Sequence, residues 1–194
     1  ADFDQAISMD PKNYDRLIEI YEALAAHGYR EVGQEYLQNV LDTAKQLDAY
    51  DSGRIYYYLG EYQKAYLALD EARDKGGADS YLYLGRAYAA TGDYNYASSV
   101  YNNYLSKQGP NAEIYNELGL CEMAKKEYQN ALAAFQAGKQ IEGNSLMQTL
   151  CFNEIVAYEY LEDYQQAEVL MNAYLQNYPD DQTAIREQQF LSTR

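Results

Sequence analysis

The sequence has very little of the chemistry on which enzymes and metalloproteins depend. Its 194 residues include one histidine, two cysteines and no tryptophan. It contains no H-E-x-x-H or C-x-x-C motif, no phosphate-binding glycine loop and no G-x-S-x-G nucleophile motif. The histidine, His27, precedes Gly28 at a predicted turn, where an imidazole suits the C-terminus of a helix. We therefore expect no catalytic residue, no metal site, no cofactor and no enzymatic activity.

Positive charge is also scarce, because 15 lysines and arginines stand against 30 aspartates and glutamates, a net charge of −15. Such a surface repels nucleic acid phosphates and anionic lipid, which excludes a nucleic-acid or membrane-surface binder. No apolar run approaches the roughly 18 residues of a membrane span. No basic segment followed by an apolar core opens the sequence, so we expect no signal peptide there.

Tyrosine is the residue in excess, with 24 copies beside four phenylalanines. Many of the tyrosines belong to a motif that recurs along the chain. The clearest copy has Tyr81, Leu84, Gly85 and Tyr88, then Ala97 and Tyr101. The next copy, 34 residues later, has Tyr115, Leu118 and Gly119, then Ala131 and Phe135. The spacing i, i+3, i+4, i+7 in the first half of each copy predicts one face of an amphipathic helix.

This motif resembles the tetratricopeptide repeat, whose signature is W-x2-L-G-x2-Y, then A-x3-F and P, with a period of about 34 residues. Five copies in phase begin near Pro11, Gln46, Ala78, Ala112 and Gln148. The resemblance implies an all-α fold, a right-handed α-solenoid of stacked antiparallel helix hairpins with about twelve helices. Small residues such as Gly85 and Gly119 stand where two helix backbones are expected to approach closely.

On this frame, residues 1–194 form a single solenoid domain. The segment 1–10 matches the second helix of a truncated repeat, so we expect the chain to begin inside an array. The five repeats are predicted to cover residues 11–45, 46–77, 78–111, 112–147 and 148–181. Asp180 and Asp181 are placed to cap a last helix within 182–194, which closes the end of the array.

The first helix of each repeat in such proteins lines a concave groove that receives an extended peptide or a partner helix. Residues one face away from the packing stripe, Leu82 among them, are predicted to point into that groove. Sixteen tyrosines, Tyr29 included, occupy predicted packing positions, and five of the remaining eight lie on the groove. The candidate partner-binding residues are Tyr50, Arg54, Tyr57, Tyr58, Tyr83, Arg86, Asn116, Phe152, Asn153 and Tyr160.

Arg54 and Arg86 hold equivalent places in consecutive repeats, which predicts a small basic row in an acidic protein. One hypothesis is that this row receives an acidic or C-terminal group of a partner. The alternative is that the two arginines neutralise neighbouring carboxylates such as Asp51 and Glu122. A family subclass clamps a terminal carboxylate with lysines and asparagines, but here the lysines are missing from the matching faces.

The leading functional hypothesis is a noncatalytic protein–protein interaction scaffold that binds a peptide or partner segment in the groove. A second hypothesis is the docking or regulatory region of a larger enzyme or sensor. A third is a structural unit that polymerises through its open ends, where the exposed face of the Phe3–Met9 helix lacks its usual partner. The expected oligomeric state is a monomer or a weak end-to-end dimer. Each hypothesis names a protein or peptide partner rather than nucleic acid, and none involves direct membrane insertion.

Two further features bear on the environment of the protein. Cys121 and Cys151 fall on the first helices of adjacent repeats, and we expect two free thiols rather than a disulfide. The acidic, tyrosine-, asparagine- and glutamine-rich composition with little lysine is typical of bacterial proteins. Since members of the repeat family with such compositions are often exported and lipid-anchored, the composition favours an extracytoplasmic location, with a cytoplasmic one as the alternative.

Overall fold

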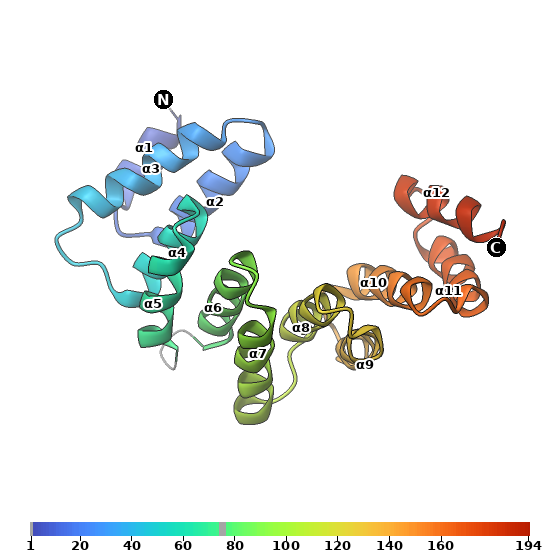
Figure 1. Ribbon diagram of the computed structural model, residues 1–194. Coiled ribbons are helices and arrows are strands. Elements are labelled where there is room, and N and C mark those ends of the chain that lie inside the picture. The colour runs from blue at the N-terminus through green and yellow to red at the C-terminus, as the bar shows by residue number, and fades with distance from the viewer. Residues whose placement is uncertain (1, 74–76) are drawn as a thin grey trace. The chain divides into compact units, whose positions relative to one another are not determined.

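A computed structural model describes residues 2–73 and 77–194 (Figure 1). Within these ranges the chain forms twelve α-helices and no β-strand, packed as successive antiparallel pairs, so the predicted all-α fold of helix hairpins is confirmed. The helices are α1 (Asp2–Met9), α2 (Tyr14–Ala26), α3 (Arg30–Thr43), α4 (Ala49–Leu59), α5 (Tyr62–Ala72), α6 (Gly77–Ala90), α7 (Tyr94–Gln108), α8 (Ala112–Ala124), α9 (Tyr128–Lys139), α10 (Met147–Tyr160), α11 (Tyr164–Asn177) and α12 (Gln182–Leu191). None of the described helices is long and apolar enough to cross a membrane.

The positions of the helices agree with the predicted repeat boundaries. Each of the five predicted repeats contains two of them, α1 lies in the segment 1–10, and α12 lies in the segment 182–194. The first residue of the predicted 1–10 segment, and residues 74–76 near the end of the predicted 46–77 repeat, lie outside the described residues. The extent of the single domain stays a prediction.

The packing divides the chain into two compact units, 1–87 and 88–194, with the boundary inside α6. In the first unit α2 packs against α3, α3 against α4 and α4 against α5. Leu17, Tyr21, Leu37 and Ile55 form its buried core, and α1 adds Ile7 at the edge of that core. The motif positions of the sequence thus supply the apolar stripe that these helices bury.

The second unit is built in the same way, from α7 to α12, each helix packing on the next. One core cluster joins α9 to α10 through Phe135, Leu150 and Ala157. A second joins α10, α11 and α12 and includes Met171 and Leu191. Because each helix buries its apolar face against its sequence neighbours, the unit is a short run of a helical solenoid.

The turn between the two helices of each repeat contains one residue with a positive φ angle. This residue is Gly28, Gly60, Gly92, Lys126 or Glu162, with φ between 61° and 84°. Glycine adopts this left-handed conformation without strain, whereas lysine and glutamate do so only against the clash of their Cβ atoms. A glycine turn is therefore a preference of this repeat and not a requirement.

Other glycines lie where two helices cross. A Cβ atom built on Gly119 of α8 would lie 2.3 Å from Cε1 of Phe135 in α9. A Cβ atom on Gly53 of α4 would lie 2.5 Å from Cγ of Leu69 in α5. The absence of a side chain at these two positions is what lets the paired helices approach closely, as the motif predicted.

The last helix is held by polar contacts as well as by packing. The Asp181 side chain caps α12 by accepting hydrogen bonds from the backbone nitrogens of Thr183 and Ala184 at 3.0 and 3.1 Å. It also accepts one from the Tyr174 hydroxyl of α11 at 2.6 Å. These bonds fix the start of α12, and they lower the pKa of Asp181, with the Tyr174 bond contributing most.

A carboxyl pair connects α12 to α10. Burial, together with the charge of the nearby Glu187 of α12 and a hydrogen bond to it, raises the pKa of Glu159 to about 7. One carboxyl oxygen of Glu159, Oε1, is fully buried and has no hydrogen-bond partner. The folded protein therefore favours the protonated form of Glu159 more strongly than the unfolded chain does.

We predict that the stabilising contribution of protonated Glu159 is complete below the unfolded pKa, near 4.5, and is lost as the pH rises through about 7. The variant Glu159→Gln, which stays neutral, should match the wild type at about pH 5 and exceed its unfolding free energy by about 1 kcal/mol at about pH 8. Urea denaturation of both proteins at the two pH values measures this difference. An equal difference at both pH values would contradict the prediction.

Candidate functional site

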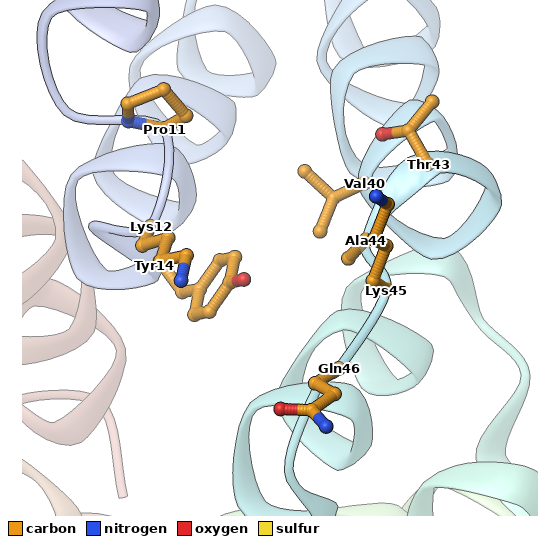
Figure 2. Close-up of a pocket in the computed structure, with 8 residues that line it drawn as sticks. All are labelled: Pro11, Lys12, Tyr14, Val40, Thr43, Ala44, Lys45 and Gln46. Atoms are coloured by element: carbon orange, nitrogen blue, oxygen red, sulfur yellow. The ribbon is translucent and has the colours of Figure 1, made fainter.

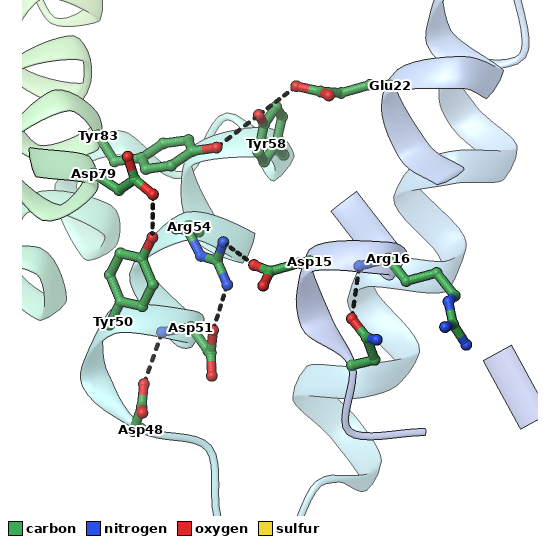
Figure 3. A network of polar contacts seen from close by, with 11 residues as sticks. Asp15, Arg16, Glu22, Asp48, Tyr50, Asp51, Arg54, Tyr58, Asp79 and Tyr83 are labelled. Atoms are coloured by element: carbon green, nitrogen blue, oxygen red, sulfur yellow. Dashed lines mark hydrogen bonds and ion pairs between the residues drawn. The ribbon is translucent and has the colours of Figure 1, made fainter. Parts of the chain in front are cut away.

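The predicted groove residues of the first unit lie on α4 and α6, and they contact residues of α2; these are the first helices of three successive repeats (Figure 3). Arg54 of α4 lies at the centre of the contacts between them. Its Nη1 donates to Oδ1 of Asp15 in α2 at 2.5 Å, and its Nη2 donates to Oδ1 of Asp51 in α4 at 2.6 Å. The guanidinium also lies 4.3 Å from the ring centroid of Tyr50.

Arg54 is only 6% exposed. Burial opposes its charge, but the hydrogen bonds to Asp15 and Asp51 outweigh burial and hold the pKa of Arg54 above its ordinary value. Burial also raises the pKa of Asp51, against the lowering effect of Arg54. Arg54 thus neutralises carboxylates inside the protein, as the alternative for this residue predicted, and Asp15 is the partner that the sequence did not indicate.

Arg86 differs from Arg54. It is half-buried on α6, and its guanidinium lies 6.0 Å from the ring centroid of Tyr83. The predicted counterpart Glu122 is engaged within the second unit, where its Oε1 accepts hydrogen bonds from Ser98 Oγ at 2.8 Å and from Lys125 Nζ at 2.7 Å. Arg86 is therefore more exposed than Arg54.

Two tyrosines of α4 link this helix to its neighbours. The Tyr58 hydroxyl donates to Oε1 of Glu22 in α2 at 2.6 Å and lies 3.0 Å from the Tyr83 hydroxyl of α6. The Tyr50 hydroxyl donates to Oδ2 of Asp79 in α6 at 3.4 Å. Burial, as the largest cause, raises the pKa values of Tyr50, Tyr58 and Tyr83. These hydroxyls therefore stay protonated and keep donating at neutral pH.

The rings of the tyrosines form a continuous cluster. Tyr57 contacts Tyr58, Tyr83 and Tyr62, with ring centroids 5.3, 5.6 and 5.9 Å apart, and Tyr58 contacts Tyr21 at 5.0 Å. Beside the cluster lies a pocket of about 460 Å³, lined by Tyr21, Glu22, Ala25, Arg30, Gln34, Tyr57, Tyr58, Gly60 and Tyr62. Two of the tyrosines predicted for the groove, Tyr57 and Tyr58, thus border a hollow of the first unit.

A second hollow of the first unit has no counterpart in the sequence predictions (Figure 2). This pocket, of about 560 Å³, is lined by Pro11, Lys12 and Tyr14 on one side and by Val40, Thr43, Ala44, Lys45 and Gln46 on the other. It lies between the turn after α1 and the segment that follows α3. No periodic signal marks it, because five of its eight lining residues belong to irregular segments.

The candidate residues of the second unit form smaller groups. The Asn153 side-chain nitrogen of α10 donates to the side-chain oxygen of Asn116 in α8 at 2.9 Å. Phe152 packs edge-on against Tyr174, and both line a pocket of about 300 Å³ together with Asn153. Tyr160 is exposed at the end of α10 and stacks on Tyr128, with ring centroids 5.0 Å apart. This bond uses the side-chain nitrogen of Asn153 and the side-chain oxygen of Asn116.

Two assignments from the sequence are wrong. Leu82 was predicted to point into the groove, but it is 2% exposed and belongs to the core, because the buried face of α6 is wider than the motif stripe. Tyr29 was predicted to pack between helices, but it is 60% exposed. It follows the left-handed Gly28 and stands at the N-cap of α3, which carries its ring away from the hairpin.

The single histidine and the two cysteines have structural surroundings. His27 caps the C-terminus of α2, and its Nδ1 lies 2.8 Å from the carbonyl oxygen of Ala23. Cys121 and Cys151 are free thiols, as predicted, and burial raises the pKa of Cys121 to about 12. Across residues 2–73 and 77–194, no group of three or more His, Cys, Asp or Glu side chains is arranged to hold a metal ion.

One buried ion pair was missed by the sequence reasoning. Glu154 of α10, whose side chain is 6% exposed, pairs with Nζ of Lys139 at the end of α9. The same carboxylate accepts a hydrogen bond from Gln136 Nε2 at 2.9 Å. Nothing in the sequence separates these residues from the other charged positions, because their meeting depends on how α9 and α10 cross.

Comparison with known proteins finds one matching family model and several solved structures with a similar fold. Residues 50–97 and 84–144 match the family model described as "Tetratricopeptide repeat". No curated protein sequence matches the chain significantly. TTC0263, described as a thermophilic TPR protein in Thermus thermophilus, is 16% identical with a TM-score of 0.70, over 93% of this chain and 100% of its own.

Two further structures extend the likeness. YrrB, described as a TPR protein with an unusual peptide-binding site, is 18% identical with a TM-score of 0.62, over 96% of this chain and 97% of its own. A chain of the APC/C hetero-tetramer Cut9-Hcn1 is 17% identical with a TM-score of 0.67 over 98% of this chain, which spans only 38% of that larger chain. At these identities the likeness concerns the fold.

Proposed function

Because this chain is a tetratricopeptide repeat protein, we propose that it is a noncatalytic interaction scaffold that binds a peptide or partner segment against the first helices of its repeats. Tetratricopeptide repeats generally mediate protein–protein interactions, and YrrB is described as having a peptide-binding site. The scarcity of catalytic side chains in the sequence agrees with a noncatalytic role.

The observation that carries this proposal is the cluster of Tyr57, Tyr58 and Tyr83 on adjacent first helices, beside a pocket of about 460 Å³. Tyrosine combines a large apolar ring with a hydroxyl and loses little conformational entropy on binding, so it is enriched at binding hot spots. We do not assign an acidic ligand to Arg54, because Asp15 and Asp51 already hold both of its terminal nitrogens. Asn116, Phe152, Asn153 and Tyr160 remain proposed partner contacts of the second unit.

A pull-down from the native organism tests the proposal. We expect Tyr57→Ala to lower the amount of captured partner about tenfold, since it removes a ring that contacts three other rings at the pocket. The matched control is Tyr96→Ala, which truncates a 42% exposed tyrosine on α7. Circular dichroism checks that both variants keep their helices. Equal capture by the wild type and both variants would rule out this surface as the binding site.

A second candidate function is the docking region of a larger protein. The observation that favours it is the match to part of a much longer chain in an assembly, the APC/C hetero-tetramer Cut9-Hcn1. The sequence of the whole gene distinguishes the two, because a docking region would be joined to a catalytic or sensor domain.

A further inference from the structure

The pocket beside α2 and α4 is lined by four tyrosines whose rings are tilted toward one another. Tyr21 comes from α2, Tyr57 and Tyr58 come from α4, and Tyr62 begins α5. The planes of Tyr57 and Tyr58 lie at 75°, those of Tyr57 and Tyr62 at 55°, and those of Tyr21 and Tyr58 at 56°. None of these three pairs is stacked in parallel, and all four rings also line the pocket.

Such an arrangement has an electrostatic consequence. The face of an aromatic ring carries partial negative charge and attracts a cation within about 6 Å of its centroid. Aromatic cages for ammonium groups are built from several aromatic rings that line one volume, as the four tyrosines do here. The chain already holds its own cations in this way, with Arg54 over Tyr50 at 4.3 Å and Lys64 over Tyr56 at 5.4 Å.

The pocket also contains a carboxylate in a fixed position. Glu22 is exposed on α2, lines the pocket, and accepts the hydrogen bond of the Tyr58 hydroxyl at 2.6 Å (Figure 3). Burial and this hydrogen bond raise the pKa of Tyr58, so the hydroxyl remains a donor and holds the carboxylate at the pocket wall. A ring cage with one anchored carboxylate is complementary to a positively charged group.

We propose that this tyrosine-lined pocket, with Glu22 on its wall, receives a lysine or arginine side chain of a basic peptide segment. The inference rests on the proposed function and specifies the chemistry of the partner. The net charge of −15 supports it, since the field of the whole protein attracts a basic segment and repels an acidic one. The pocket wall also contains Arg30, the first residue of α3. Its positive charge repels a bound cation, so a substitution of Arg30 provides a second test of the proposal.

The test measures binding of two short labelled peptides, alternating lysine–serine and alternating glutamate–serine, by fluorescence anisotropy at physiological salt. We expect only the lysine peptide to bind. Glu22→Gln keeps an acceptor for Tyr58 but removes the charge, and should raise the Kd about three- to tenfold. Arg30→Gln should lower the Kd about two- to fivefold, and Tyr62→Leu should raise it by a similar factor without changing the charge.

The matched control is Glu71→Gln, which makes the same charge change at an exposed position in the last turn of α5. It should alter the Kd less than twofold. If Glu22→Gln and Glu71→Gln weaken binding equally, the peptide binds through net charge and the pocket assignment is overturned. If Tyr57→Ala abolishes capture of the native partner while the lysine peptide does not bind, the scaffold function stands and the basic-segment assignment fails.

Discussion

Replacing Lys139 by methionine is expected to lower the unfolding free energy by about 3–5 kcal/mol. The substitution leaves the Glu154 carboxylate, 6% exposed, with Gln136 as its remaining partner. A buried charge without a counterion costs more than the packing that methionine retains. Urea denaturation near neutral pH measures the loss.

An exposed ion pair of the same chain serves as control. Lys64 and Glu61 pair on the surface, where the lysine side chain is 61% exposed, so Lys64→Met should cost much less stability than Lys139→Met. The double variant Lys139→Met with Glu154→Leu should recover most of the loss, because two apolar side chains replace two charges. A loss in Lys139→Met no larger than that in Lys64→Met would show that the Glu154 carboxylate does not need its counterion.

Gly119→Ala is expected to destabilise the protein by about 1–3 kcal/mol, although alanine is the better helix former by about 1 kcal/mol. The added Cβ atom would lie 2.3, 2.6 and 2.7 Å from three ring atoms of Phe135, which is fully buried. The ring has no free space to move into, so α8 and α9 must separate. Thermal or urea denaturation measures the change.

A double variant distinguishes this clash from other effects. Phe135→Leu removes the ring atoms that the new methyl group meets, so Gly119→Ala should cost clearly less in that background than in the wild type. Gly138→Ala provides a milder comparison, because its Cβ atom would meet flexible ends of Leu150 at 3.0 and 3.1 Å. Identical costs of Gly119→Ala in both backgrounds would be inconsistent with a clash against Phe135.

The helices could be predicted well from the sequence because the same residue pattern occurs in five copies of the repeat. Each copy places its apolar residues and its turn at equivalent positions, so an ambiguous signal in one copy is corrected by the next. The close approach at Gly119 also follows from the motif, since a glycine inside a helix at this position has no turn to form. These features depend on local periodicity, which a single sequence displays.

The polar contacts between repeats were much harder to predict. Arg54 lies 39 positions from Asp15, and Tyr58 lies 36 positions from Glu22. Their contacts depend on the axial register of α4 against α2, and the hydrophobic pattern does not define this register to within one side chain. The sequence did place Tyr58 and Tyr83 on one surface, but it did not indicate that the Tyr58 hydroxyl donates to Glu22, a contact that supports the proposed basic partner.

The left-handed turns bear on how the repeats diverge after duplication. A Cβ atom added at Gly28, Gly60 or Gly92 would meet no atom within 4 Å, so a change of residue there disturbs only its own backbone. Lys126 and Glu162 are two such changes, each at a backbone cost of about 1–2 kcal/mol. Substitution at a helix crossing instead displaces a whole helix. A degenerate copy of this repeat is therefore better identified by its small residues at helix crossings than by its turn glycines.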